Sequence, residues 1–385
     1  MMMVDKETSK ETFMPVQAMP SNAHHQTLRA RPLRDAPTSD PPPLMLAGLS
    51  VVQPTRAAAP YSLRWYRAWE GDLYRRAVRK TGRRQWDLTR FSVDGGPDAL
   101  KAGYRETQAA VSQAAKQAMA VAESNCGRPG SRERLALLYF DFWGQCSHLE
   151  QAFNWRDSFD LDVIPKFLLR DHGVNGYSCK IQAGRAGFVQ GLRMANDLLN
   201  GGDIDSVLLG GVFRFYPALG FSEAIVNAEQ EQRWLGKAGQ HNASTVERAG
   251  FVVLKRADAA VKAKASPLMI ASPQYLAIGG SGEPVSQQLT QSWSSLLPEG
   301  CGSIYGGLYP SSVLAAAESS ASVAISSLAT YENLCRRFGD SGGINPLLAL
   351  QHYAKQKHAA ASPDIAPALL SLSDSNGATW LLRCE

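Results

Sequence analysis

The chain has 385 residues, of which 44% are hydrophobic and 19% charged, and its formal net charge is +5 at pH 7. These values are ordinary for a globular protein and allow two domains or one large duplicated fold. Because no block of five or six like charges occurs, a nucleic-acid-binding function is disfavoured, and we expect no nucleic acid among the partners.

The cysteines and the apolar runs exclude several other classes of protein. Six cysteines are scattered without a Cys-x-x-Cys spacing, so we expect neither a disulfide scaffold nor a metal site, and no pattern indicates a cofactor. No run of 18 apolar residues occurs, and the N-terminus lacks an apolar signal-peptide core. We therefore expect no membrane span and a cytoplasmic location.

The first half of the chain begins with a polar segment. Residues 1–43 are rich in proline and predict a disordered tail. Residues 44–52 form an apolar run bounded by prolines, which predicts a buried strand. Beyond this run, predicted strands alternate with segments of helical periodicity. The predicted helices cover about 98–124 and 188–199, and the predicted strands cover 135–140, 206–212 and 250–254.

A second half begins near residue 265. Its predicted strands cover 268–271, 368–372 and 379–382, and its clearest predicted helix covers about 346–357. The alternation of strands and helices predicts an α/β architecture with sheets buried on both faces. We assign residues 44–264 and 265–385 to two halves, between which no sequence repeat is visible.

The most specific pattern in the chain surrounds Arg185. The run Arg185-Ala186-Gly187-Phe188 opens the predicted helix, and Gly210-Gly211 closes the strand that follows it. This layout resembles the nucleophile segment of the thiolase-fold condensing enzymes, most closely ketoacyl synthase III. In that family, the residue before Ala-Gly-Phe is the cysteine that accepts the acyl group, at a helix N-terminus that lowers the pKa of its thiol. The resemblance implies a thiolase-like five-layered αβαβα fold with duplicated halves.

Three further segments carry the same resemblance. Residues 246–254 are similar to the family's Gly-Asp-Gly-Ala-Gly strand entry, with Arg248 where a glycine is usual. Residues 339–343 look like the family's Gly-Asn-Thr/Ser turn, with Asp340 in place of the catalytic asparagine. Residues 375–380 resemble the C-terminal Gly-rich signature, whose backbone N–H groups support the oxyanion site. The resemblance implies that Gly377 and Ala378 would provide these groups here.

The family's catalytic histidine has no counterpart in this chain. In the family it belongs to a Pro-His-Gln-Ala run, and the resemblance puts Ser311 in its position. No histidine lies between His241 and His352. The resemblance therefore maps the Cys-His-Asn triad onto Arg185, Ser311 and Asp340. Arginine is protonated and is not a nucleophile, serine is a poor proton-transfer group, and an ionised aspartate repels a developing enolate.

Three coordinated losses predict a protein without the family's chemistry. We expect a non-catalytic member, similar to a chain-length-factor subunit, in fatty-acid, polyketide or related secondary-metabolite biosynthesis. It would pair with an active ketosynthase paralogue as a heterodimer, or form a homodimer, and acyl carrier protein and coenzyme A thioesters are further candidate partners. Because Arg185 and Asp340 carry opposite charges at positions that lie close together in the family, we hypothesise a buried salt bridge between them.

Two alternative functions remain open at this point. An active enzyme with a different nucleophile would use Cys179, whose pKa the neighbouring Lys180 would lower. A strand or loop residue without chemistry is the simpler interpretation of this cysteine. A stand-alone acyl- or carboxylate-binding protein would instead use Arg185 to hold an anion at the helix N-terminus.

Overall fold

The structure is a computed structural model, and the part of the chain that it describes forms one compact unit within Pro41–Glu385. It describes residues 41–55, 57–61, 68–91, 99–128, 130, 132–142, 164–235, 240, 243–258, 267–278, 283–297, 302–327, 329–359, 366–374 and 377–385. The predicted disordered tail lies outside the described residues, except for the exposed residues 41–43 directly before the first strand.

Five strands of the first half form one side of the main sheet. They are β1 (Leu44–Val52), β4 (Leu135–Phe142), β5 (Ser178–Ile181), β6 (Ser206–Phe213) and β8 (Arg248–Arg256). Their order from the sheet edge is β5-β4-β6-β8-β1. The strands β5, β4 and β6 are parallel, whereas β8 is antiparallel to both of its neighbours. If these five strands are numbered 1 to 5 in chain order, their order across the sheet is 3-2-4-5-1.

Five strands of the second half repeat this topology. They are β9 (Leu268–Ile270), β11 (Gly302–Gly306), β12 (Ala329–Asn333), β13 (Ala368–Ser373) and β14 (Ala378–Cys384). Their order from the other edge is β12-β11-β13-β14-β9, again 3-2-4-5-1, and the fifth strand is again antiparallel to both neighbours. The fold is therefore duplicated, although the two halves share no visible sequence repeat.

Short pairings complete the sheets. Antiparallel pairing of β1 with β9, from Leu44 to Leu46, joins the two groups of strands into one continuous sheet. The strand β10 (Gln274–Ala277) pairs with β14 outside this path. A separate small sheet contains β2 (Ala59–Pro60), β3 (Asp87–Thr89) and β7 (Thr245–Val246).

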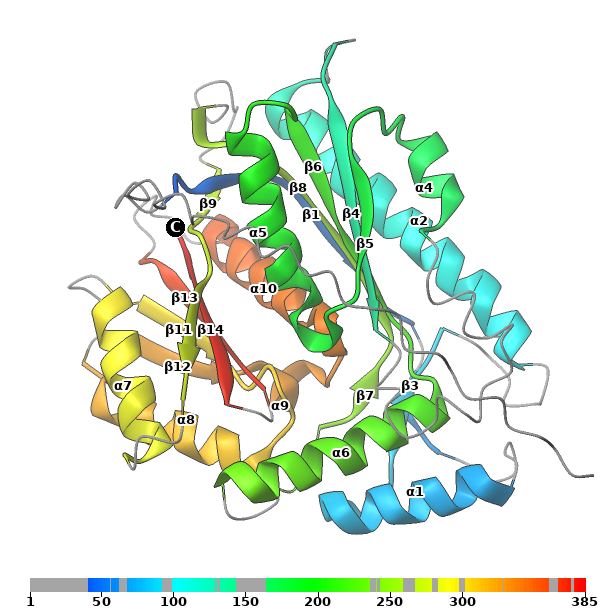
Figure 1. The fold of residues 1–385 in the computed structure, drawn as a ribbon, viewed down its shortest axis with the longest axis vertical. Coiled ribbons are helices and arrows are strands. Elements are labelled where there is room, and N and C mark those ends of the chain that lie inside the picture. The colour runs from blue at the N-terminus through cyan, green and yellow to red at the C-terminus, as the bar shows by residue number, and fades with distance from the viewer. Residues whose placement is uncertain are drawn as a thin grey trace, which may run out of the picture. The chain divides into compact units, whose positions relative to one another are not determined.

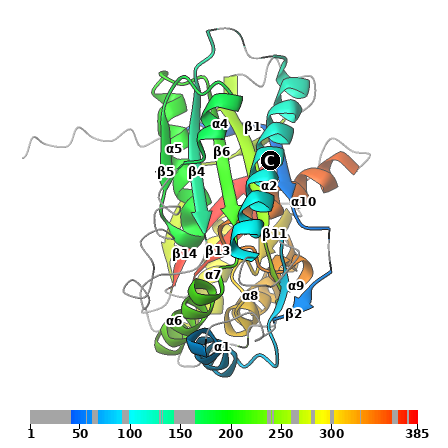
Figure 2. The same cartoon turned by 90° about the vertical axis from the view of Figure 1, so that its right-hand side faces the viewer.

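The helices make the fold five-layered (Figure 1). The central helix layer, between the two groups of strands, contains α5 (Gly187–Asn200) and α10 (Asn345–Ala359). Outside the first group lie α2 (Ala99–Cys126) and α4 (Lys166–Asp171), and outside the second lie α7 (Val285–Leu296) and α8 (Ser312–Ala324). Figure 2 shows α1 (Ala68–Thr81) beside α6 (Pro217–Leu235). A short helix, α9 (Leu334–Phe338), precedes the turn into α10. None of the described helices is long and apolar enough to cross a membrane.

The strands lie where the apolar runs of the sequence predict them. The strand β6 is buried at every position because helices cover both faces of the sheet, as an apolar strand in an α/β fold requires. The predicted strand 44–52 is β1, the predicted helix 188–199 is α5, and the predicted helix 346–357 is α10. These predictions are confirmed to within two residues at each end.

Candidate functional site

The two central helices begin with the same backbone turn. A 3-10 turn, Gly184–Ala186, leads into α5, and a second, Gly342–Ile344, leads into α10. The residue before each turn has nearly the same backbone angles, with φ −134° and ψ 23° at Ala183 and φ −126° and ψ 29° at Ser341. The two turns contact each other (Figure 1). The fold duplication therefore brings two helix N-termini, Gly187 and Asn345, to one place although they are far apart in the chain.

Arg185 and Asp340 meet at this place. The guanidinium Nη1 and Nη2 of Arg185 donate to Asp340 Oδ1 and Oδ2, each at 2.8 Å. Arg185 Nε donates to Glu223 Oε1 of α6, also at 2.8 Å. The side chains of Arg185, Asp340 and Glu223 are 17%, 6% and 7% exposed. The hypothesised buried salt bridge is therefore confirmed. Arg185 and Asp340 form a bidentate arginine–carboxylate pair, and Glu223 is a second carboxylate bound to the same guanidinium.

The surroundings of Asp340 favour its ionised form. Burial alone would raise the pKa of this carboxyl, but attraction to Arg185 and hydrogen bonds from Arg185 and Asn345 lower it to about 2. The Asn345 amide and the Gly342 N–H both donate to Oδ1, at 2.8 and 3.0 Å. Gly342 has a φ of 54°, and an added Cβ would lie 2.5 Å from Phe142, so glycine is required here. The turn is thus built to hold a carboxylate.

Burial acts on the other two members of the cluster as well. It raises the pKa of Glu223, and the attraction of Arg185 only partly opposes this. Burial alone would lower the pKa of Arg185, but Asp340 and Glu223 raise it well above its ordinary value. The arginine therefore stays charged and offers no nucleophile at the start of α5.

Aromatic side chains close the cluster. The Arg185 guanidinium lies 5.1 Å from the ring centroid of Tyr309 and 5.6 Å from that of Phe142. The remaining cavity beside Arg185, Glu223, Tyr309 and Asp340 has a volume of about 20 Å³. One water molecule needs roughly 10–15 Å³ of such volume. The cavity therefore accommodates a single water, and an acyl chain does not fit beside Arg185 in this conformation.

Ser311 lies outside the Arg185 cluster and caps a helix. Its Oγ accepts a hydrogen bond from the Leu314 N–H at 3.1 Å at the N-terminus of α8, and it donates to Glu231 on α6. Both side chains are buried. Ser311 is thus occupied in a structural role, which serine at an N-cap commonly has.

Arg248 fills the position where the family usually has glycine. It donates from Nε to Gln53 Oε1 at 3.0 Å, from Nη1 to Ser341 Oγ at 2.5 Å and from Nη2 to the Phe338 carbonyl at 2.6 Å. Burial lowers the pKa of Arg248 to about 10, which leaves it charged at neutral pH. Arg248 therefore ties β8 to the segment that carries Asp340.

The backbone donors predicted at the C-terminal turn are already engaged. The Ala378 N–H donates to Asp374 Oδ1 at 3.0 Å, and the Gly377 N–H is directed at the Asp374 carbonyl at 3.4 Å. The preceding residues 375 and 376 lie outside the described part of the chain. In this arrangement neither amide is available to a substrate oxygen.

Cys179 is partly buried in β5, where it packs against the apolar cluster that includes Phe188. Its neighbour Lys180 points to the opposite face of the strand, as alternation requires, and forms an ion pair with Asp141 at 3.0 Å. Cys179 does not line the cavity beside Arg185. The Lys180 ammonium, which the alternative nucleophile Cys179 would need beside it, therefore faces Asp141.

Sequence reasoning missed the contribution of α6. Glu223, Asn227 and Glu231 are spaced by four residues and form a buried polar stripe on this helix. The stripe contacts Arg185 at one end and Ser311 at the other, and Asn227 donates to Glu223 at 3.3 Å. The four-residue spacing of polar residues in an otherwise apolar segment is the signal that could have found it.

Comparisons with known proteins give a likeness in structure but none in sequence. No family model matches the chain, and no curated protein matches it. A chain of the type II polyketide assembly AntDE:AntF, an acyl carrier protein in complex with its ketosynthase, is 13% identical with a TM-score of 0.57. The match covers 89% of this chain and 99% of that one.

Two further solved structures have the same fold. An OleA variant from Xanthomonas campestris bound to cerulenin is 10% identical with a TM-score of 0.52, covering 90% of this chain and 97% of that one. The PfaC ketosynthase–chain length factor is 10% identical with a TM-score of 0.55, covering 91% of this chain and 44% of that longer one. Together with the duplicated topology, these matches show that the chain has the thiolase-like α/β fold of the ketosynthases.

Proposed function

We propose that this chain is a non-catalytic ketosynthase-fold subunit that pairs with an active condensing enzyme. One observation carries the proposal. The position that resembles the family's nucleophile is an arginine, and two buried carboxylates, Asp340 and Glu223, hold its guanidinium in place. Condensation in this fold needs a thiolate that accepts an acyl group. A charged guanidinium in a cavity of about 20 Å³ supplies neither the nucleophile nor the space.

The site is organised as a structural element. Arg185, Asp340, Glu223 and Asn345 join both central helices and α6 through hydrogen bonds of 2.8 Å. Such a network ties the two halves together where an active enzyme would keep an open pocket. The role proposed for the chain is therefore assembly and shaping of a partner's acyl tunnel, in fatty-acid, polyketide or related secondary-metabolite biosynthesis.

The edge of the main sheet is the proposed contact with the partner. Within the described residues, β5 pairs only with β4, so one row of its backbone N–H and C=O groups is open. An open sheet edge is a template for a strand from another chain. The likeness to a ketosynthase–chain length factor supports an active ketosynthase as the partner. A homodimer through the same edge is the alternative.

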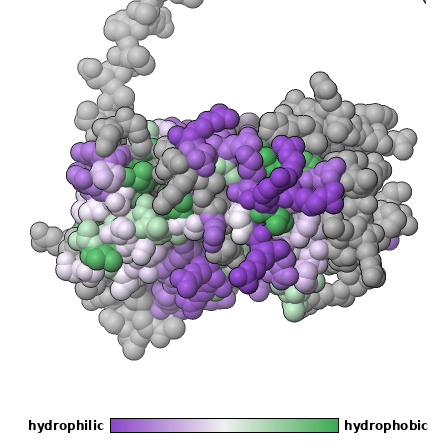
Figure 3. Space-filling view, turned by 90° about the horizontal axis from the view of Figure 1, so that it is seen from below, coloured by the Kyte–Doolittle hydropathy of each residue, from purple (hydrophilic) through white to green (hydrophobic). Residues whose placement is uncertain are grey.

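An acidic carrier protein is a second proposed partner, and α1 is its proposed docking surface. Arg76, Arg79 and Arg84 are exposed, and no described carboxylate lies within ion-pair distance of them. Figure 3 views the unit from the side where Figure 1 draws α1 and α6, and hydrophilic side chains gather on this face. A positively charged surface attracts a negatively charged protein and speeds its association at low salt.

Co-purification tests the proposed pairing. The tagged chain is co-expressed with an intact Cys-His-Asn ketosynthase encoded in the same genome, and the mass of the purified complex is measured by light scattering. We expect a stoichiometric complex whose condensing activity needs both chains, and no acyl adduct on this chain when it is incubated alone with acyl-coenzyme A. A homodimer of this chain that does not bind the ketosynthase would contradict the pairing.

A second experiment separates the alternative enzyme from the proposed subunit. Iodoacetamide labelling of the isolated chain, in the presence and absence of an acyl thioester, reports whether Cys179 accepts an acyl group. We expect slow labelling that the thioester does not affect. Selective labelling of Cys179 that the thioester prevents would favour an enzyme with this nucleophile.

Charge reversal tests the proposed carrier surface. Arg76→Glu and Arg79→Glu should weaken binding of the carrier protein, whereas Lys116→Glu on α2 should leave carrier binding unchanged.

A further inference from the structure

A larger cavity lies at the opposite end of α10 from the Arg185 cluster. It has a volume of about 250 Å³ and is bordered by β1, the ends of α2 and α10, and the start of β9. The helix α10 has 15 residues, which corresponds to a length of roughly 22 Å. The cavity is therefore separate from the candidate site and shares no lining residue with it.

The strand β1 is irregular where it lines this cavity. The register with β8 shifts between Leu46 and Gly48, which leaves Ala47 as a bulge. The carbonyl of Ala47 accepts a hydrogen bond from the Asn125 amide at 3.0 Å, so α2 fixes the bulge. Pairing with β9 stops at Leu46, so within the described residues the edge of β1 beyond the bulge has no strand beside it.

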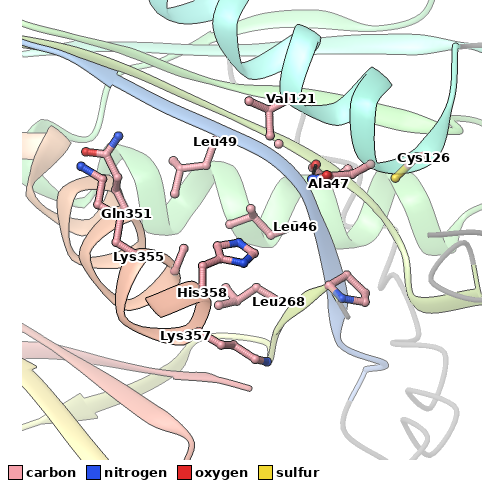
Figure 4. Close-up of a pocket in the computed structure, with 14 residues that line it drawn as sticks. Leu46, Ala47, Leu49, Val121, Cys126, Leu268, Gln351, Lys355, Lys357 and His358 are labelled. Atoms are coloured by element: carbon pink, nitrogen blue, oxygen red, sulfur yellow. Dashed lines mark hydrogen bonds between the residues drawn. The ribbon is translucent and has the colours of Figure 1, made fainter. Parts of the chain in front are cut away.

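The lining of the cavity has one apolar part and one cationic part (Figure 4). Leu46, Leu49 and Leu268 form the apolar part, and Figure 4 shows His358 reaching from the end of α10 toward Leu46 and Leu268. Lys355 and Lys357 stand in the same turn of α10. None of the described residues that line the cavity is an aspartate or a glutamate.

We propose that this cavity binds an amphipathic monoanion, an unbranched alkyl chain of about eight carbons that ends in a carboxylate. At roughly 10–15 Å³ per water-sized group, as for the cavity beside Arg185, about 250 Å³ has room for a chain of this length. The alkyl chain lies against the three leucines, where its transfer from water is favourable. The carboxylate lies at the end of α10, where Lys355 and His358, three residues apart on one face of the helix, donate hydrogen bonds to it. Lys357, on another face of the same turn, adds positive charge nearby.

Cys126 provides a reporter for this site. It lines the cavity from the end of α2, and burial raises the pKa of its thiol. Alkylation of Cys126 by iodoacetamide at pH 8.5 is followed by peptide mass spectrometry in the full-length protein, with increasing sodium octanoate. Cys179 in β5 serves as the internal control because it lies outside the cavity. We expect octanoate to slow the alkylation of Cys126 at least fivefold and to leave that of Cys179 unchanged.

Variants and a neutral probe test the two parts of the proposal. The double variant Lys355→Gln with Lys357→Gln should weaken octanoate binding about tenfold, measured by calorimetry, whereas Lys80→Gln on α1 should not change it. Ala354→Trp, which places a large side chain in the cavity, should abolish protection, with circular dichroism as the check on folding. Equal protection by octanoate and 1-octanol would overturn the assignment of an anion. Unchanged alkylation of Cys126 at millimolar octanoate would overturn the site itself.

Discussion

The salt bridge between Arg185 and Asp340 gives the most decisive prediction. Arg185→Met keeps a side chain of similar length but removes the charge, which strands two buried carboxylates, Asp340 and Glu223. Breaking a buried ion pair by removing one partner costs about 3–5 kcal/mol. Asp340→Asn should cost less, because Arg185 keeps its 2.8 Å contact with Glu223.

The double variant separates a specific pairing from general disruption. In Arg185→Met with Asp340→Asn, neither charge of the pair remains, so its cost should fall short of the sum of the single costs by about 2 kcal/mol. The free energy of unfolding is measured by urea denaturation at pH 7. As a control, Arg170→Met removes an arginine whose ion pair with Asp171 is exposed and should cost less than about 1 kcal/mol. Additive costs of the two single changes would refute a pairing between Arg185 and Asp340.

The pH dependence of the wild type provides a second measurement on the same pair. The pKa of Asp340 falls from its ordinary 3.8 to about 2 in the folded protein. At about 1.36 kcal/mol per pKa unit, this contributes about 2 kcal/mol of stability. Because the folded-state pKa is the lower one, this stability is present above pH 4 and is lost as the pH falls toward 2. Asp340→Asn should lack this loss between pH 4 and pH 2, and a retained loss would contradict the assignment.

Three further predictions concern other parts of the fold. Burial raises the pKa of Glu318 from 4.5 to about 7, so its stabilising contribution is present below pH 4.5 and is lost as the pH rises through 7. Glu318→Gln should therefore be more stable than the wild type at pH 8 by about 3 kcal/mol, and urea denaturation should give little difference at pH 5. Gly342→Ala should destabilise the protein more than Gly173→Ala, because both glycines have positive φ but only Gly342 would place a Cβ against Phe142; equal shifts in the urea midpoint would argue against this contact. Ser311→Ala should cost at least about 1 kcal/mol in the same assay, because it removes the N-cap and the hydrogen bond to the buried Glu231. Ser320→Ala, in the exposed part of the same helix, should cost almost nothing.

Duplication explains how an arginine and an aspartate from the two halves of the chain form one buried pair. Each half contributes one central helix that begins with the same turn, so the residues at these turns face each other across the pseudo-symmetric centre. A charge introduced at one turn is buried and needs a partner at the other. Arg185 and Asp340 satisfy this requirement mutually, with Glu223 as the second acceptor for the guanidinium.

The sequence alone determined the strands and the central helices. The run 207–213 is apolar apart from two glycines, and the segment from Gly187 to Asn200 has apolar residues at helical spacing. Composition and periodicity therefore identify both elements without tertiary information. The motif at Arg185 and the turn at Asp340 carried the resemblance that predicted the fold. Because the matching positions lie close together in the family that these segments resemble, their opposite charges predicted the contact. Local spacing predicts the strands and helices because these elements depend on residues close together in the chain.

Only the tertiary structure decided what completes the site. Glu223 comes from α6, 38 residues after Arg185, and no local pattern around either residue reports the other. Ser311 lies two residues after Tyr309, yet Tyr309 faces the Arg185 guanidinium whereas Ser311 turns away to cap α8. The size of the remaining cavity likewise depends on aromatic side chains from three separate segments. Side-chain directions and long-range packing are set by the arrangement of the helices and strands, which the sequence pattern does not encode locally.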